Sequence, residues 1–451
     1  MGINANSDAT IYALSSGPGR AGIAVFRLSG PAAGAALVKL IGALPAPRRA
    51  MVRALRDPAT GETLDRGLVL WLPQPASFTG EDMAEVHAHG GRASVAAILR
   101  AFAALGSGLN LRMAEPGEFT RRAFQNGKLD LTAAEGLADL VAAETETQRR
   151  QAFRQMEGAL GALYGSWRDA IVRASALMES EIDFSDQDLP TGLVGRARAE
   201  IESLLESIRT HLADSHRGER VREGIRVAIV GPPNVGKSTL LNALARREAA
   251  IVSDIPGTTR DVIEVPLDIA GFKVVLADTA GVRESVELIE REGVRRALAE
   301  ARSADIAILV CDPETTDEIE TILESTSKES SQLIVITNKY DLNPGRNPRI
   351  SGLPVSAKTG AGLDELVQAI RSRIETVFGS AEDHGPALTR ARHRELLEAC
   401  AGNLARALKA ESPELIAEDL RLAARALGAI TGHIDVEKIL DSIFRDFCIG
   451  K

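Results

Sequence analysis

The sequence predicts a multidomain protein: an N-terminal α+β domain, a helical domain built from two separate segments, and an α/β domain with a phosphate-binding loop inserted between those segments. Three observations support this fold class. The chain of 451 residues is too long for a single hydrophobic core. Residues 231–238 read Gly-Pro-Pro-Asn-Val-Gly-Lys-Ser, a complete phosphate-binding loop. Helical periodicity occurs on both sides of the region that carries this loop.

The first 220 residues are predicted to form two parts. Residues 1–120 mix short apolar runs with a helical stretch, which is typical of a small α+β domain. Its strands are expected at residues 23–28, 67–72 and 83–87, and a helix at 94–105. Residues 121–220 have a long helical pattern with a capping box at Thr132 and Glu135. The one clear break in this pattern is at 183–190, and a polar stretch at 217–224 then acts as a linker.

The remaining chain is predicted to contain the inserted domain and the second helical segment. Residues 221–377 alternate strands with helices, as an α/β domain requires. Residues 378–451 contain helical patterns at 390–409, 413–430 and 436–447. Because amphipathic helices need a shared core to bury their apolar faces, the two helical segments are expected to merge into one domain.

Composition narrows the class of protein. Hydrophobic residues make up 45% of the chain but aromatic residues only 4%, so the cores must be aliphatic. The formal charge of −9 argues against the strongly basic surface that tight nonspecific binding of nucleic acid needs. Any RNA contact must therefore use local clusters of basic residues or a partner. Three widely spaced cysteines argue against a disulfide framework. With no signal-peptide pattern and no apolar stretch near 18 residues, we expect a cytoplasmic protein.

The phosphate-binding loop joins an apolar run at 226–230 to a helical pattern at 238–245. Gly231 and Gly236 allow backbone conformations that aim N–H groups at phosphate oxygens, and the helix N-terminus adds its positive dipole end. Lys237 supplies a charge for the β and γ phosphates, and Ser238 a hydroxyl ligand for Mg²⁺. The expected nucleotide contacts here are Asn234, Val235, Gly236, Lys237, Ser238 and Thr239.

A second motif identifies the base. Asn338-Lys339-Tyr340-Asp341 follows an apolar run, and the Asp341 carboxylate can accept hydrogen bonds from the two N–H donors that guanine has and adenine lacks. Ser356-Ala357-Lys358 comes next and offers the Ala357 N–H to the guanine oxygen. Buried polar partners reject the wrong base because they would be left unpaired. Specificity for GTP over ATP is therefore expected.

Two further segments are expected to change state with the nucleotide. Asp278-Thr279-Ala280-Gly281 follows an apolar run, which puts the Asp278 carboxylate where a metal-water ligand belongs. Residues 257–261 read Gly-Thr-Thr-Arg-Asp, and Thr259 is the candidate for a second Mg²⁺ ligand. Taken alone, this second segment would be read as an ordinary glycine turn with solvated threonines.

Val282 occupies the position where many GTPases carry the glutamine that orients the attacking water. A valine cannot do this, so another polar group must reach the site or hydrolysis is negligible. Downstream candidates are Arg283, Glu284, Glu287 and Glu290. Charged residues in such a helical pattern are more often a solvated face.

Short motifs occur along the whole chain outside the phosphate-binding loop. They are Gly-Arg-Ala-Gly at 19–22, Phe-Thr-Gly-Glu-Asp at 78–82, Pro-Gly-Glu-Phe at 116–119, Asn-Gly-Lys-Leu-Asp at 126–130, Gly-Thr-Thr-Arg-Asp at 257–261 and Phe-Cys-Ile-Gly-Lys at 447–451. With these motifs the chain resembles the MnmE family of tRNA modification GTPases, also called TrmE. The GTPase motifs alone would also fit ribosome-assembly factors that switch with GTP and do no covalent chemistry, or a dimeric scaffold shaped by its nucleotide.

The resemblance implies a homodimer formed through an N-terminal folate-binding-like domain. It implies a 5,10-methylene- or 5-formyl-tetrahydrofolate as one-carbon donor, with contacts on Arg27, Glu85, Lys128 and Lys451. It also implies an FAD-containing partner, MnmG or GidA, in a heterotetramer-type complex. Together they would add an aminomethyl or carboxymethylaminomethyl group to C5 of the wobble uridine in certain tRNAs.

The resemblance further implies a K⁺ ion at the phosphates, bound by Asn234 and by the backbone carbonyls of Ser253, Ile255 and Thr258. Such an ion would stabilise charge that grows during phosphoryl transfer. Among the downstream candidates, the resemblance implies that Glu290 takes the water-orienting role. The nucleotide and cation segment would comprise Ser253, Asp254, Ile255, Pro256, Gly257, Thr258 and Thr259.

Other polar residues allow two interpretations each. By family position Cys448 is a candidate nucleophile, although a lone cysteine is more often a packed side chain. His87 and His89 suggest a metal pair, but we expect them on opposite faces of a strand. Arginines at 121–122, 149–150 and 390–394 could contact tRNA phosphates, and solvated helix faces are the favoured interpretation.

Overall fold

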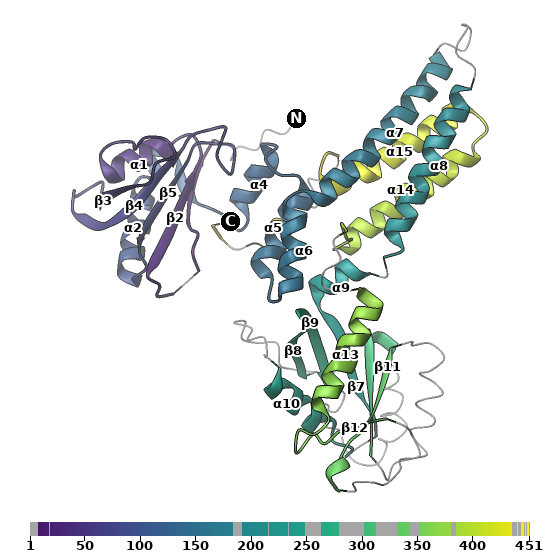
Figure 1. The fold of residues 1–451 in the computed structure, drawn as a ribbon. Coiled ribbons are helices and arrows are strands. Elements are labelled where there is room, and N and C mark those ends of the chain that lie inside the picture. The colour runs from purple at the N-terminus through teal and green to yellow at the C-terminus, as the bar shows by residue number, and fades with distance from the viewer. Residues whose placement is uncertain are drawn as a thin grey trace, which may run out of the picture. The chain divides into compact units, whose positions relative to one another are not determined.

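The computed structural model describes residues 8–17, 19–183, 192–214, 216–232, 234–248, 263–278, 302–312, 332–342, 352–379, 385–434, 440, 443–445, 447 and 449–450. Figure 1 shows its helices and strands. The chain divides into two compact units. Unit 1 comprises Met1–Ala138, Gln155–Arg168 and Ala424–Lys451, and unit 2 comprises Asp139–Arg154 and Asp169–Ala423.

Unit 1 contains a six-stranded sheet in the order β3-β4-β5-β2-β1-β6. All neighbours are antiparallel except β1 and β6, which are parallel. Buried residues alternate with less buried ones along β5, as expected for a strand with one face on a core. The strands are β1 Thr10–Leu14, β2 Ile23–Ser29, β3 Met51–Arg56, β4 Thr63–Leu72, β5 Met83–His89 and β6 Leu111–Met113.

Helices α1 (Ala33–Ile41) and α2 (Arg92–Ala104) pack on one face of this sheet. Phe26, Leu37 and Phe102 are fully buried between them. On the other face Phe119, at the start of α4 (Glu118–Gln125), packs with Ile11 and Met83 in a smaller cluster. One face of the sheet is thus closed by helices, whereas the other is covered by Phe119 and its neighbours.

The predicted capping box is wrong. Helix α5 (Leu131–Ala142) begins one residue before Thr132, and the Asp130 carboxylate accepts from the Ala133 N–H at 2.7 Å. Asp130 therefore caps the helix, because its side chain reaches the unpaired N–H groups of the first turn. Further along unit 1, Phe444 and Phe447 pack on Leu131.

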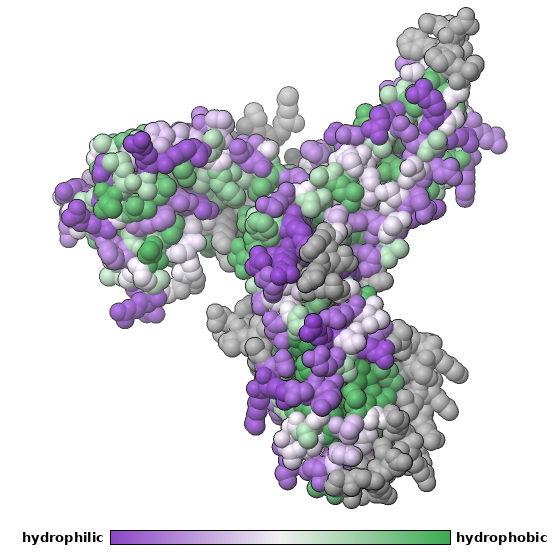
Figure 2. All heavy atoms as spheres, viewed as in Figure 1, coloured by the Kyte–Doolittle hydropathy of each residue, from purple (hydrophilic) through white to green (hydrophobic). Residues whose placement is uncertain are grey.

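The helices of unit 2 include the second predicted segment. Helix α14 (Ala391–Lys409) packs on α8 (Leu193–Leu212), and Arg198 of α8 donates to the carbonyl oxygens of Leu408 and Ala410 at the end of α14. Helix α6 Glu146–Met156 lies mostly in this unit, and α7 Ala159–Asp183 and α15 Pro413–Thr431 have residues in both units. The short helix α3 Gly106–Leu109 belongs to unit 1. In the face seen in Figure 2, hydrophilic and hydrophobic residues are interspersed.

The polar stretch at 217–224 was predicted to be a linker, but most of it is helical. Residues Arg217–Glu223 make a helix, α9, that leads directly into the second sheet. The carbonyl of Leu388 approaches so closely that a Cβ on Gly218 would lie 2.1 Å from its oxygen. Packing between the segment that leads into the second sheet and the segment around Leu388 therefore holds these charged residues in a helix, although their sequence has only a weak helical pattern. The helix expected at 436–447 lies mostly outside the described residues.

The second sheet has the order β12-β11-β10-β7-β9-β8 and is parallel except for β8, which runs antiparallel to β9. All six residues of β10 are buried, as expected for a central parallel strand. Helices α10 and α13 share one core cluster with the sheet. The elements are β7 Ile225–Val230, α10 Lys237–Arg247, β8 Ile263–Ile269, β9 Phe272–Asp278, β10 Ile306–Cys311, β11 Leu333–Thr337, the 3₁₀-helix η1 Tyr340–Leu342, β12 Leu353–Pro354 and α13 Leu363–Phe378.

Candidate nucleotide-binding site

The phosphate-binding loop connects β7 to α10, as the sequence predicts. Gly236 adopts φ +96° immediately before the first residue of α10, and a Cβ there would lie 2.5 Å from the Asn338 amide nitrogen. A Cβ on Gly231 would lie 2.3 Å from the Val310 carbonyl oxygen. Both positions therefore require glycine, and the loop leads into a helix N-terminus that attracts anions.

The polar side chains of the loop lie at this helix N-terminus. The Lys237 ammonium donates to the carbonyl oxygens of Gly231 and Pro232, each at 2.8 Å, so it folds over the loop. Ser238 and Thr239 are exposed in the first turn of α10, and Asn234 is exposed at φ +62°. The loop thus presents one cation, two hydroxyl groups and one amide to whatever occupies it.

Asn338 connects the phosphate-binding loop to the loop after β12. Its amide nitrogen donates to the Val235 carbonyl oxygen at 2.7 Å, and its amide oxygen accepts from the Ala357 N–H at 3.0 Å. The side chain is almost fully buried, and its backbone N–H donates to the Cys311 carbonyl oxygen. One side chain therefore holds together three segments that are far apart in the sequence.

Asp341 and Ser356 meet beside this bridge. The Ser356 hydroxyl donates to the Asp341 carboxylate at 2.6 Å and accepts from the Thr359 N–H. Asp341 and Lys358 are exposed, whereas Ser356 and Ala357 are buried. The structure thus brings the two predicted base-reading segments into contact, with the Asp341 carboxylate at the surface.

Asp312 is a residue of this site that the sequence analysis missed. Its carboxylate accepts from the Lys339 ammonium at 2.9 Å. Asp312 directly follows the buried strand β10, and the carboxyl ends of neighbouring parallel strands meet at one edge of a sheet. A polar residue immediately after such a strand was the signal that could have identified it.

Several predicted site residues lie outside the described residues. Asp278 is described only in its backbone, as the last residue of β9; it pairs in register with Ile229 of β7, so the two strands end at the same edge. The remaining predicted contacts outside the description are Ser253, Asp254, Ile255, Pro256, Gly257, Thr258, Thr259, Thr279, Ala280, Gly281, Glu290, Cys448 and Lys451.

A second polar group lies on the sheet of unit 1. Arg27 of β2 and Glu85 of β5 are cross-strand partners, and the guanidinium donates twice to one carboxylate oxygen at 3.0 and 3.1 Å. The guanidinium also stands over the rings of Phe78 and Phe119 at 5.7 and 5.9 Å. Lys128 donates to the Pro75 carbonyl oxygen at 3.0 Å, so it borders the same loop as Phe78.

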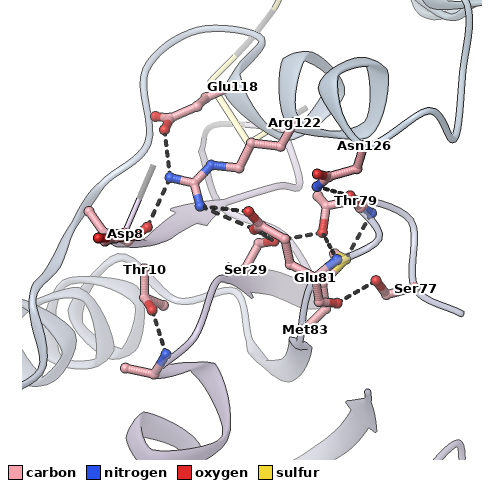
Figure 3. Close-up of polar contacts among 12 residues, drawn as sticks. Asp8, Thr10, Ser29, Ser77, Thr79, Glu81, Met83, Glu118, Arg122 and Asn126 are labelled. Atoms are coloured by element: carbon pink, nitrogen blue, oxygen red, sulfur yellow. Dashed lines mark hydrogen bonds and ion pairs between the residues drawn. The ribbon is translucent and has the colours of Figure 1, made fainter. Parts of the chain in front are cut away.

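A buried network fixes that loop (Figure 3). Arg122 of α4 donates to the carboxylates of Glu81 and Glu118 and to the Ala9 carbonyl oxygen. The Ser29 hydroxyl donates to Glu81 at 2.7 Å. Further contacts of the loop include the hydrogen bond between the Ser29 and Thr79 hydroxyls and the donation from Asn126 to the Thr79 carbonyl oxygen. Apart from Arg122, which was expected on a solvated helix face, sequence reasoning had not assigned these side chains an individual role.

Glu118 is ionised in this network. Burial opposes its charge, but hydrogen bonds from Arg112, from the Glu115 N–H and from Arg122 outweigh burial and hold its pKa below the ordinary value. Burial raises the pKa of the Cys311 and Cys400 thiols to about 12, so both stay protonated and unreactive.

The solvated-face interpretation of the arginine clusters is wrong for several members. Arg122 is buried, Arg390 pairs with Asp139, and Arg394 pairs with Asp214 and Glu219. It holds for the exposed Arg149 and the half-exposed Arg150, which both pair with one glutamate of their own helix.

The histidine prediction also needs correction, because residues two apart on a strand share a face. His87 lies near the Glu85 carboxylate, and His89 contacts Asp65 at 2.8 Å. Within the described residues no group of three potential ligands could hold a metal ion. In the same part of the chain, no helix is long and apolar enough to cross a membrane.

A phosphate-binding loop and an Asn-Lys-x-Asp motif, joined by Asn338 at the carboxyl edge of a parallel sheet, define a P-loop GTP-binding protein. Family models described as "MnmE helical domain" and "GTP-binding protein TrmE N-terminus" match residues 131–448 and 10–128. The chain belongs to the MnmE family, and it is a GTPase that acts in tRNA modification.

Similar proteins include the tRNA modification GTPase MnmE of Parvibaculum lavamentivorans, 57% identical over 98% of this chain and 100% of that protein. The mitochondrial 5-taurinomethyluridine-[tRNA] synthase subunit GTPB3 of Homo sapiens is 48% identical over 99% of this chain and 94% of that protein. Among solved structures, the G domain of the T. maritima FeoB iron transporter is similar over 33% of this chain and 98% of that chain, at 27% identity and a TM-score of 0.26.

Proposed function

We propose that the chain couples GTP hydrolysis to the addition of an aminomethyl or carboxymethylaminomethyl group to C5 of the wobble uridine in certain tRNAs. The name of the human relative describes a tRNA uridine substituted at position 5, which supports chemistry at that carbon. The observation that carries the proposal is the Asn338 bridge, because it assembles a guanine nucleotide site in a chain that matches the family over nearly its full length.

The residues of the phosphate-binding loop suit GTP with two cations. Ser238 offers an exposed hydroxyl at a helix N-terminus, and Mg²⁺ prefers oxygen ligands. The exposed amide of Asn234 can supply an oxygen to K⁺, with the carbonyls of Ser253, Ile255 and Thr258 as further ligands and Thr259 as the second Mg²⁺ ligand. Both cations would neutralise negative charge on the phosphates when bound. Lys237 adds its positive charge, and Glu290 would orient the attacking water.

The sheet of unit 1 suits a reduced folate. Arg27 can pair with a folate carboxylate and already stands over two aromatic rings, while Glu85 can accept from pterin N–H groups. Lys128 and Lys451 would add positive charge. Supplying a one-carbon unit is the chemistry expected of the bound folate, either the 5,10-methylene or the 5-formyl form. The residues of this chain would bind and orient it.

The chemistry also requires partners. We expect a homodimer formed through the N-terminal domain and a heterotetramer-type complex with an FAD-containing protein of the MnmG or GidA kind. Cys448 is the candidate nucleophile at the C-terminus. The substrate is a tRNA, in line with the name shared by the bacterial relatives.

Folate binding tests the proposal directly. Titration of the full chain with 5-formyl-tetrahydrofolate should show saturable binding that Arg27→Met weakens at least about tenfold, since a charge-assisted pair is lost. Arg100→Met, which removes an exposed arginine from α2, is the matched control. Absence of binding to the parent chain would contradict the folate part of the proposal. Mass spectrometry of wobble uridines from cells lacking the protein should show the C5 group missing.

The cation and water roles are tested by kinetics. GTP hydrolysis should be faster in K⁺ than in Na⁺, and equal rates would refute a K⁺ site at Asn234. Glu290→Ala should retain GTP affinity and lose turnover. Unchanged turnover would assign the role to another residue, such as Glu287.

A further inference from the structure

The hairpin of β8 and β9 reaches from the nucleotide site to the helical part of unit 2. At one end, β8 begins at Ile263 after the predicted switch segment, and β9 ends at Asp278 beside β7. At the other end the turn is Ala270-Gly271, with φ +54° and +83°. Positive φ at both turn residues is typical of the tight turns that match the twist of paired strands. Six residue steps along β9 make the hairpin about 20 Å long.

The tip of this hairpin has an internal hydrogen bond and is bonded to α6 and the loop before it. The Asp268 carboxylate accepts from the Gly271 N–H at 2.8 Å, which braces the turn from inside. The Gly271 carbonyl oxygen accepts from the Thr147 N–H in the first turn of α6 at 3.1 Å. Lys273, the second residue of β9, pairs with Glu144 at 2.5 Å. The first turn of a helix has N–H groups without partners inside the helix, so the tip satisfies one of them.

The same part of α6 also contacts α9, the helix that leads into the GTPase sheet. The Gln148 amide nitrogen donates to the Arg222 carbonyl oxygen at 2.9 Å, and that of Gln151 donates to the Gly218 carbonyl oxygen at 2.8 Å. The amide oxygen of Gln148 accepts from the N–H groups of Glu144 and Thr145. One buried glutamine therefore connects the loop that carries Glu144 to the end of α9.

Asp139, near the end of α5, completes the attachment. Its carboxylate accepts from Arg222 of α9 at 3.0 Å and from Arg390, just before α14, at 2.9 Å. These two residues mark the places where the chain enters and leaves the GTPase sheet. The segment that enters the GTPase sheet, the segment that leaves it and the hairpin tip are thus all bonded to residues Asp139 to Gln151, which we name the docking segment.

We propose that the docking segment is a positioning element for GTP hydrolysis: it holds the β8–β9 hairpin at its tip and thereby positions the far end of β9, where the backbone of Asp278 pairs with Ile229 of β7. A strand pair of this length transmits displacement because its hydrogen-bonded ladder resists stretching and shear.

A charge-swap experiment on the full chain tests this. Glu144→Lys and Lys273→Glu each place like charges opposite one another and should lower kcat for GTP hydrolysis about threefold, the scale of a partly exposed ion pair. The affinity for fluorescent GDP should stay within about twofold. The double variant restores opposite charges and should return kcat to the parental value. Glu375→Lys, which breaks an exposed pair inside α13, is the matched control and should leave kcat unchanged.

Each other outcome overturns the proposal. Single variants with parental kcat would mean that the tip contact does not position the site. A double variant no faster than the single variants would mean that the changes act by general destabilisation. The GDP affinity shows that the nucleotide site of each variant is folded, so a loss of kcat with parental GDP affinity cannot come from unfolding of that site.

Discussion

Replacement of Asn338 by alanine is expected to weaken the nucleotide site from within. The parent side chain makes two hydrogen bonds, to the Val235 carbonyl oxygen and from the Ala357 N–H, at 2.7 and 3.0 Å. Alanine makes neither. The two loops that should surround the nucleotide then lose the side chain that joins them, and the conformation that binds GTP becomes less populated.

The expected loss of nucleotide affinity follows from the burial of the groups that Asn338 bonds. Each hydrogen bond contributes about 1 kcal/mol net, and leaving a buried backbone donor without a partner costs about 1 kcal/mol or more in addition. Val235 and Ala357 are both buried, so water cannot easily replace the lost partner. The sum is about 3 kcal/mol, which corresponds to about a hundredfold loss of affinity if all of it is expressed in binding.

The assay is a fluorescence titration of the full chain with labelled GDP. Asn338→Ala should bind about a hundredfold more weakly than the parent. Asn338→Asp keeps an acceptor for the Ala357 N–H but cannot donate to Val235, so it should also bind more weakly. Asn403→Ala on α14 is the matched control, because the Asn403 side chain accepts only from Arg406 of its own helix among the hydrogen bonds of the described chain. Binding by Asn338→Ala within about threefold of the parent would refute the reasoning.

Two other predictions concern the network around Arg122. Arg122→Met should destabilise unit 1 by about 3 kcal/mol in urea unfolding, because it leaves the Glu81 and Glu118 carboxylates without one partner, whereas exposed Arg100→Met should not. An equal effect of the two variants would contradict this. The depressed pKa of Glu118 adds stability that is present above its unfolded pKa of about 4.3 and is lost as pH falls through the lower folded value. Urea unfolding between about pH 3 and 6 should show this loss, and Glu118→Gln should remove it.

Local motifs were predictable because their physics is local. The phosphate-binding loop needs glycine at two nearby positions and a lysine and a hydroxyl at the start of one helix, and all of these lie within residues 231–238. Strands β7, β9 and β11 were predictable from the apolar runs that precede the three motifs, whereas β10, which is buried at every position, was not predicted individually. Helix α15 begins and ends within one residue of its predicted bounds, because its helical pattern is also local.

Errors arose where neighbouring signals competed or where a distant segment decided the outcome. Asp130 and Thr132 are both good cap residues, and the hydrogen bond to Ala133 shows that Asp130 has that role. Residues Arg217–Glu223 have the composition of a linker but form α9, because the segment around Leu388 packs against them. Arg122 was expected on a helix face in water, yet its partner Glu81 is 41 residues away.

By itself the sequence determined the class of nucleotide site, the alternation of strands and helices around it and the family, because each of these depends on residues within a few positions of one another. Only the tertiary structure determined that Asn338 joins two loops, that Arg122 is buried between two carboxylates, and that Asp139 is bonded to both the segment that enters the GTPase sheet and the segment that leaves it. Such contacts join segments up to 251 residues apart. Their partners are chosen by how the whole chain packs, which no local pattern encodes.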